Sequence, residues 1–206
     1  MGRIIDRRRV MSGKSLPYDA EIEYLETNGT QWIDTGIAAQ DPMEGRIIFE
    51  KLSKNGANTS IFGCREYPAN DRFYFAYDYY NTLMLGYRDK YSFSSFNLKN
   101  GKADVYTVLH VDHQQLTCND TIIANTYSSQ SGRMSCNVMI FNIHGNKKPA
   151  MIEPYRLYQA SLYTMGVPLW DSIPVRIGTT GYMYDKVSGQ LFGNAGTGAF
   201  ILGPDK

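Results

Sequence analysis

The sequence predicts an all-β protein that folds as one sandwich of two sheets. Short segments rich in β-branched and aromatic residues recur along the chain, separated by turn signals. The chain contains 19 glycines and 16 tyrosines, and no long segment follows the 3.6-residue period of an amphipathic helix. Its 206 residues suffice for one large core, whereas a second domain would leave both parts small.

The strongest turn and strand signals lie at the C-terminal end, in residues 182–203. A strand at 182–184, a turn at 185–189 and a returning strand at 190–192 form a predicted hairpin, in which Gly189 is free to adopt a positive φ. The glycines at 193, 196 and 198 then predict a loop in which two backbones approach closely. We expect the hairpin to lie near Asn28-Gly29, with buried side chains at Leu191, Phe192 and Phe200.

Residues 24–36 form a second pattern of strand, Asn28-Gly29 turn and strand. The run Asn-Gly-Thr-Gln-Trp-Ile-Asp-Thr-Gly at 28–36, together with Tyr-Asp-Lys-Val-Ser-Gly-Gln-Leu-Phe-Gly-Asn-Ala-Gly-Thr-Gly at 184–198, resembles the laminin-G/concanavalin A-like jelly rolls. The likeness is greatest to versions in virion proteins of tailed phages, such as the crAss-like phages of gut bacteria, and in proteins of gut bacteria themselves. It spans roughly residues 18–204 and implies a concanavalin A-like jelly roll over 18–206 behind an extended arm at 1–17.

Between these two regions the chain alternates strands and turns. We expect inward side chains at Ile22 and Tyr24, and at Tyr158, Ala160 and Leu162 on a later strand. Val105, Thr107, Leu109 and Val111 share one face by strict alternation. Asn119-Asp120 predicts a hairpin turn that tolerates left-handed φ. The remaining predicted strands cover residues 46–52, 60–64, 72–77, 83–87, 114–123, 136–143 and 167–177.

The N-terminal arm is basic and partly apolar. It is either a solvated tail or a docking segment. In the docking interpretation, arginines bind carboxylates of a neighbouring protein through paired hydrogen bonds while aliphatic side chains become buried. The residues predicted to make this contact are Arg3, Ile4, Ile5, Arg7, Arg8, Arg9 and Val10.

No catalytic or metal-binding pattern is present, so we expect no enzyme activity, no metal and no cofactor. The nearest carboxylate cluster, Glu21, Glu23 and Glu26, is typical of a solvated strand face, and no Gly-x-Ser-x-Gly motif occurs. His110 and His113 would lie on opposite faces of a strand, and His144 is isolated. Turn chemistry accounts for the oxygen-bearing residues that could surround a rim calcium ion, namely Asp112, Asn119, Asp120 and Asp185.

Glycan binding needs exposed aromatic rings beside polar groups. Tyr77, Tyr79, Tyr80 and Asn81 are the candidate residues, within a tyrosine-rich region that also includes Tyr74, Tyr87 and Tyr91. Trp32 and Trp170 are two further aromatics that could lie at the surface. Ordinary sheet packing is the alternative explanation, because tyrosine is favoured in strands.

Charge and cysteine content restrict the partners and the cellular compartment that we expect for this protein. A net charge of +1 gives no overall attraction to nucleic acid, and no apolar run is long enough to span a membrane. The N-terminus lacks the apolar segment of a signal peptide. We therefore expect Cys64, Cys118 and Cys136 to be free thiols in a protein made in a host bacterial cytoplasm.

With the resemblance included, the leading prediction is a non-enzymatic phage virion protein. It would be a capsid decoration, a head fibre or an auxiliary component, attached through its arm to capsid protein or to another copy of itself. The alternative is a carbohydrate-binding module on a virion or cell surface. Because the same sandwich carries lectins, hydrolases and structural parts, the fold does not decide between them.

Overall fold

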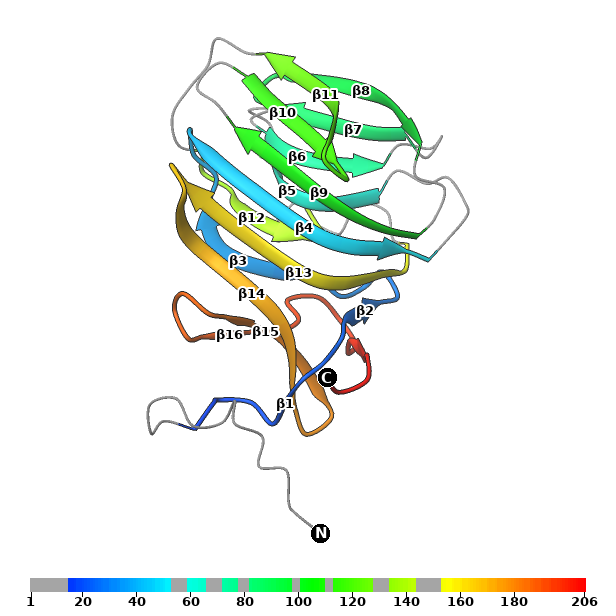
Figure 1. The fold of residues 1–206 in the computed structure, drawn as a ribbon, viewed down its shortest axis with the longest axis vertical. Helices are drawn as coiled ribbons and strands as arrows, with labels where there is room; N and C mark the ends of the chain where they lie inside the picture. The colour runs from blue at the N-terminus through cyan, green and yellow to red at the C-terminus, as the bar shows by residue number, and fades with distance from the viewer. Residues whose placement is uncertain are drawn as a thin grey trace.

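The computed structural model describes residues 15–52, 59–65, 72–77, 82–97, 101–109, 113–127, 134–143 and 153–206. These residues contain strands and no helix, and the strands form two sheets stacked as a sandwich (Figure 1). The all-β prediction is therefore confirmed. Residues 1–14 of the predicted arm at 1–17 lie outside the described residues, so the arm remains a prediction.

The larger sheet has eleven strands. Eight of them form a continuous order, and three short ones join near the chain ends. The order is β11 (Thr121–Tyr127), β10 (His113–Cys118), β9 (Gly101–Leu109), β4 (Met43–Lys51), β13 (Tyr155–Thr164), β14 (Val167–Ile177), β15 (Thr180–Asp185) and β16 (Leu191–Phe192). The short strands are β1 (Ala20–Glu21), which pairs with β14, β2 (Leu25–Thr27), which pairs with β13, and β17 (Ile201–Leu202), which pairs with β2.

The smaller sheet has six strands. Their order is β3 (Ile33–Ala38), β12 (Asn137–Ile140), β5 (Thr59–Arg65), β6 (Arg72–Tyr77), β7 (Thr82–Tyr87) and β8 (Lys90–Asn97). All the pairs in both sheets are antiparallel. Sequence-distant strands such as β4 and β13 are direct neighbours, which is the long-range connectivity of a jelly roll.

The core lies between the two sheets and is strongly aromatic. Tyr155 of the larger sheet stacks on Phe141, just after β12, with ring centroids 5.5 Å apart. Phe62 and Phe75 stack across β5 and β6 at the same separation. Each fully buried side chain of this size contributes roughly 1.5–3 kcal/mol through removal of apolar area from water.

Two hairpins each turn on two successive left-handed residues, and the sequence predicted left-handed φ for one of these turns, Asn119-Asp120. Asn119 and Asp120 have φ values of 48° and 64° and join β10 to β11. Met165 and Gly166, with φ values of 48° and 75°, join β13 to β14 in the same way. Two successive positive φ values match the twist of the flanking strands, so these turns close the hairpins tightly.

Tyr158 faces outward, contrary to the alternation expected for its strand. The pairing of β13 with β4 shifts register between Leu157 and Gln159. This bulge places Leu157 on the buried side together with Ala160 and Leu162, and turns Tyr158 toward Glu50 on the outer face. A bulge inserts one extra residue, so extending the alternation back from Leu162 gave the wrong face.

Residues 24–36 do not form a hairpin. Gly29 has a φ of 103°, as the turn requires, but β2 belongs to the larger sheet and β3 to the smaller one. The turn thus carries the chain between the layers. Ile22 and Leu25 are buried, whereas Tyr24 is only partly covered, so the inward prediction is right for Ile22 and wrong for Tyr24.

The C-terminal hairpin forms as predicted, with Gly189 at a φ of 73°. The loop after it, rather than the hairpin itself, covers the 28–32 region. The amide of Ala195 donates to the carbonyl of Trp32 at 2.8 Å, and that of Thr197 donates to Thr30 at 3.0 Å. Phe200 is buried as expected, but Leu191 and Phe192 are only partly buried.

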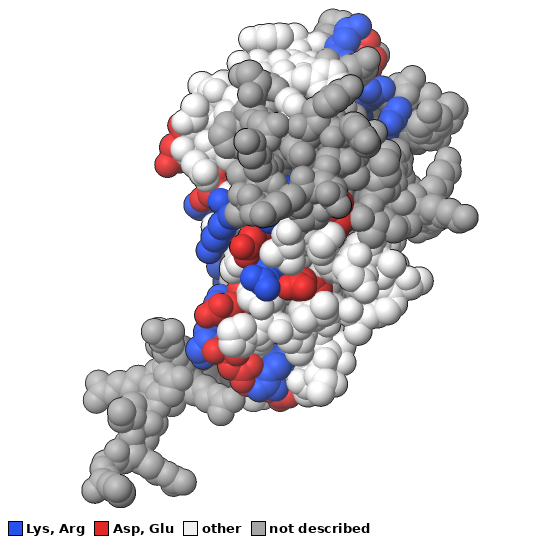
Figure 2. Space-filling view, turned by 90° about the vertical axis from the view of Figure 1, so that its right-hand side faces the viewer, with Lys and Arg blue, Asp and Glu red and all other residues white. Residues whose placement is uncertain are grey.

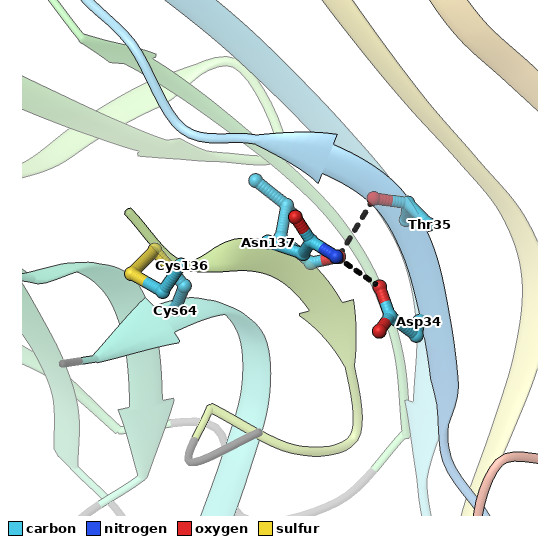
Figure 3. The surroundings of a disulfide bond; sticks show 6 residues. Asp34, Thr35, Cys64, Cys136 and Asn137 are labelled. Atoms are coloured by element: carbon cyan, nitrogen blue, oxygen red, sulfur yellow. Dashed lines mark hydrogen bonds between the residues drawn. A yellow bond between two sulfur atoms is a disulfide. The ribbon is translucent and has the colours of Figure 1, made fainter. Parts of the chain in front are cut away.

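The prediction of three free thiols is wrong for two of them, because Cys64 and Cys136 form a disulfide (Figure 3). The antiparallel pairing of β12 with β5 brings their Cα atoms to 5.8 Å, a normal separation for a disulfide. Asn137 donates to Asp34 at 3.1 Å, and the Thr35 hydroxyl donates to the Val138 carbonyl at 2.7 Å, which ties this segment to β3. Cys118 is free and buried.

Candidate functional site

The outer face of the larger sheet carries a depression of about 480 Å³. Four neighbouring strands, β10, β9, β4 and β13, contribute lining residues, and the turns after β10 and β13 form the rim. Its lining residues are Glu44, Arg46, Asp104, Thr117, Asp120, Tyr163 and Gly166. This pocket combines the phenol ring of Tyr163, three carboxylates, one guanidinium and the hydroxyl of Thr117.

Arg46 and Asp104 form a two-pronged ion pair within the pocket. The Nε of Arg46 donates to Oδ1 of Asp104 at 2.8 Å, and Nη2 of Arg46 donates to Oδ2. This hydrogen bonding raises the pKa of Arg46 above its ordinary value, with smaller contributions from the charge of Asp104 and from Tyr163 and Asp120. The guanidinium therefore has a fixed position among acidic groups.

The rim at Asp120 is also held in place. The backbone amide of Asn119 donates to the carbonyl of Asp104 at 2.9 Å, and the Asn119 side chain accepts from the Asp104 amide at 3.1 Å. These bonds tie the β10–β11 turn to β9. The Asp120 carboxylate is thus presented by a rigid turn rather than by a long loop.

Tyr163 is the aromatic wall of the pocket. It pairs with Glu44 across β13 and β4, so both side chains project from the outer face. Its ring is partly exposed, and among the described residues it has no stacked ring, no cation above it and no hydrogen bond. Tyr163 is therefore a partly exposed aromatic side chain that lines the pocket.

Two other tyrosines that the structure describes on this face, Tyr24 and Tyr158, are already covered. The guanidinium of Arg156 lies 4.4 Å from the ring centre of Tyr24, and the Nζ of Lys102 lies 4.0 Å from that of Tyr158. Tyr158 also donates to Glu50 at 2.7 Å. Partial burial, together with that hydrogen bond, raises the pKa of Tyr158 to about 12. These rings belong to a structural network and offer no open stacking face.

The predicted glycan site is not the depression that the structure contains. Tyr79, Tyr80 and Asn81 lie outside the described residues, and so does the side chain of Tyr77. Those four residues remain a prediction. Within the same tyrosine-rich region, Tyr74 and Tyr87 are buried and cannot stack on a ligand.

The two tryptophans are core residues, contrary to the expectation that they could lie at the surface. Trp170 is 1% exposed and meets Phe192 edge-on at 5.6 Å. Trp32 is 8% exposed beneath the loop containing Gly196. Each is covered by a segment distant in sequence, which local patterns do not reveal.

The acidic candidates behave as structural groups. Glu26 pairs with Arg156 at 2.8 Å, and Glu21 and Glu23 are exposed and do not line the pocket. Asp185 accepts from the amides of Asp171, Val187 and Ser188, which confirms turn chemistry for this residue. Among the described residues, no cluster of potential metal ligands is found. The same residues include no helix that could cross a bilayer.

The seven arm residues from Arg3 to Val10 lie outside the described residues, as do His110, Asp112 and His144.

The sequence did not predict most of the pocket residues as members of a binding site. Arg46 and Tyr163 occupy outward positions of strands that were predicted, whereas Glu44 precedes the predicted strand at 46–52, since β4 begins earlier, at Met43. Only the pairing of β4 with β9 and β13 brings these residues together. Asp120 was considered as a turn residue and as a possible oxygen donor to a rim calcium ion, but not as part of a glycan site.

No family model matches the sequence, and no curated protein matches it either. Solved structures do match the fold. A candidate carbohydrate-binding protein from Bacteroides ovatus aligns with a TM-score of 0.63 at 11% identity, over 88% of this chain and 60% of that protein. The chain therefore spans 60% of the length of that neighbour.

A heptameric SAP-like pentraxin from Limulus polyphemus aligns with a TM-score of 0.50 at 15% identity, over 94% of this chain and 92% of the pentraxin. The chain is a concanavalin A-like jelly roll. The CBM40 module of the Ruminococcus gnavus IT-sialidase, bound to α2,3-sialyllactose, aligns more loosely, with a TM-score of 0.47 at 17% identity over 70% of this chain and 92% of that module. None of these three descriptions concerns a phage. At such identities the jelly-roll likeness establishes architecture alone.

Proposed function

We propose that this jelly roll is a carbohydrate-binding domain and that the depression on the larger sheet is its binding site. The partly exposed ring of Tyr163, within a pocket of hydrogen-bonding side chains, carries the proposal. A sugar ring has an apolar C–H face that stacks on an aromatic ring, and hydroxyls at its edge that bond to carboxylate and guanidinium groups. A volume of about 480 Å³ is within the usual range of ligand pockets.

The geometry also suits a ligand that arrives from solution. Arg46 and Asp104 are 46% and 35% exposed, and they are held in place by each other before any ligand binds. Such preorganisation reduces the entropy cost of binding. The description of the Bacteroides ovatus neighbour is consistent with this proposal, although fold similarity alone does not define a ligand.

We infer binding without hydrolysis. A glycosidase needs one carboxylic acid in an apolar environment and a second carboxylate across the bond that is cleaved. Here Glu44, Asp104 and Asp120 are all at least partly exposed, and Asp104 is held by Arg46. Prolonged incubation with a bound oligosaccharide should release no new reducing ends. Turnover that is lost in Glu44→Gln or Asp120→Asn would refute this part of the proposal.

The binding proposal is tested with the full chain on a glycan array, followed by calorimetry on the strongest ligands. Tyr163→Ala should reduce affinity by about fivefold or more, taking as a guide the roughly 1–3 kcal/mol that stacking of a nucleic-acid base on one aromatic side chain contributes. Tyr182→Ala is the matched control, because Tyr182 is a partly exposed tyrosine of the same sheet that does not line the pocket. Equal losses in both variants, or no glycan bound at all, would refute the proposed site.

Attachment to a virion stays a prediction, and so do capsid protein or another copy as partners. A carbohydrate-binding domain can be carried on a virion or on a cell surface, so the two ideas are compatible. The disulfide favours a final location that is oxidising, such as the outside of a particle or cell. Synthesis in a host bacterial cytoplasm is likewise a prediction.

A further inference from the structure

The turn between β13 and β14 carries an exposed methionine in an unfavourable backbone conformation. Met165 has a φ of 48° and its side chain is 80% exposed. A left-handed φ in a tight hairpin turn favours asparagine, aspartate or glycine, because the Cβ of other residues crowds the backbone. The turn between β10 and β11 follows this preference with Asn119 and Asp120. At Met165 the preference is broken, and so exposed a side chain gains little from burial in return.

This methionine stands at the rim of the proposed binding site. The next residue, Gly166, lines the pocket, and a Cβ added there would meet no atom of the described residues within 4 Å. The rim is therefore open at this point. Across the pairing of β13 with β14, the exposed Pro168 lies opposite Tyr163. Such partners project from the same face of a sheet, so an apolar surface continues from the Tyr163 ring beyond the pocket.

The opposite end of the pocket also has an exposed apolar side chain. Ile122 of β11 is 57% exposed and pairs with Thr117, which lines the pocket. Ile122 therefore projects from the same outer face. From β11 through β10, β9, β4 and β13 to β14 there are five strand spacings, or roughly 24 Å in all. The surface between Ile122 and Met165 is much longer than one sugar ring.

Apolar side chains, rather than a patch of one charge, distinguish the surface at both ends of the pocket. On the side of the sandwich that Figure 2 shows, the described basic and acidic side chains lie next to one another rather than in separate patches. A ligand long enough to cover Met165 and Ile122 would gain affinity by removing their apolar area from water.

We infer that the site binds an internal stretch of a sugar chain rather than a single terminal sugar. This inference rests on the proposed function, because it specifies the ligand class of the same site. One unit stacks on Tyr163 in the pocket, and its neighbour crosses the rim at Gly166 and lays a C–H face on Met165. A unit on the other side reaches Ile122. The flexible thioether of methionine adapts to a puckered sugar face, which accounts for a methionine where asparagine would fit the backbone better.

The dependence of affinity on chain length is the first test. Cello-, xylo-, manno- and N-acetylchito-oligosaccharides of one to six units would be titrated into the full chain by calorimetry. In a series that binds, affinity should rise about tenfold or more from the shortest binding oligomer to the hexasaccharide. Each of the two apolar side chains should contribute about three- to fivefold, the effect of covering roughly 30–40 Å² of apolar surface. Equal affinity at every length would overturn the inference.

Met165→Asn separates binding from stability. Asparagine suits a left-handed φ, so this variant should raise the midpoint of thermal unfolding by about 1–4 °C. The same variant should bind the hexasaccharide about three- to fivefold more weakly, while its affinity for the shortest binding oligomer stays unchanged. A merely structural role of Met165 would not produce a gain in stability together with a length-dependent loss of affinity.

Val167→Thr is the matched control. Val167 follows the same turn and is 59% exposed, but strand alternation places it on the opposite face of β14 from Pro168. Its replacement by a polar residue of similar shape should leave affinity unchanged at every chain length.

The outcomes distinguish the two proposals. If oligosaccharides bind through Tyr163 but Met165→Asn binds the hexasaccharide as tightly as the parent chain, the chain inference is overturned and the binding site stands. If Val167→Thr weakens binding as much as Met165→Asn does, or if Met165→Asn alters only self-association in sedimentation, the inference is also overturned. If no series binds at any length, the proposed function fails and the inference fails with it.

Discussion

Replacing Gly196 by alanine should displace the loop that follows the C-terminal hairpin from its place against the sandwich. A Cβ added at this position would lie 2.0 Å from the carbonyl oxygen of Thr30 and 2.7 Å from Cδ1 of Trp32. The first contact is with backbone and the second with a nearly buried ring, so neither can be relieved by rotating a flexible side chain. The loop itself has to move away.

The loss of stability can be estimated from the contacts that the loop makes. Displacement breaks the bonds from Ala195 to Trp32 and from Thr197 to Thr30, each worth about 0.5–1.5 kcal/mol. It also uncovers part of Trp32, which is 8% exposed, at a further 1–2 kcal/mol or so for the apolar area returned to water. We therefore expect Gly196→Ala to lower the free energy of unfolding by about 2–5 kcal/mol.

Urea denaturation followed by tryptophan fluorescence measures this change, because Trp32 lies directly beneath the loop. Gly193→Ala is the matched control, since its added Cβ would meet only the Tyr182 ring, at 3.3 Å. That variant should lose less than about 1 kcal/mol, the usual range for a tolerated surface change. If the two glycine variants lose equal stability, or Gly196→Ala loses less than about 1 kcal/mol, the close contact is not what anchors the loop.

Three other predictions can be checked directly. Thiol titration of the denatured chain without reductant should detect Cys118 alone, and three thiols before reduction would contradict the disulfide. Reducing the disulfide should lower the free energy of unfolding by roughly 4 kcal/mol, because Cys64 and Cys136 are 72 residues apart and the bond restricts the entropy of that loop in the unfolded chain. Burial raises the pKa of Cys118 to about 11 from 9.0, so the folded state keeps the thiol proton to a higher pH than the unfolded state does. The free energy of unfolding should therefore fall as the pH rises above about 9, and it should fall less steeply in Cys118→Ala. The same dependence of stability on pH in both proteins would refute this prediction. Deleting residues 1–15 should leave the denaturation midpoint unchanged but abolish incorporation into particles. Normal incorporation would rule out the arm as the attachment element, and a loss of folding would show that it belongs to the core.

The sequence by itself determined the features that depend on neighbouring residues. The period-two strands, the left-handed turn at Asn119-Asp120 and the positive φ of Gly189 are local, because side-chain alternation and backbone sterics act over a few residues. The resemblance of residues 28–36 and 184–198 then added the jelly-roll architecture, which the two stacked sheets confirm.

The tertiary structure decided the features that depend on which strands meet. Arg46 and Asp104 are 58 residues apart and become partners only because β4 pairs with β9. The same kind of long-range pairing joins Cys64 to Cys136 and buries Trp32 under the loop at Gly196. A single bulge in β13 turned Tyr158 outward, because one extra residue exchanges the two faces of a strand. Strand order and bulges reflect the packing of the whole core, so the pocket became visible only in the folded chain.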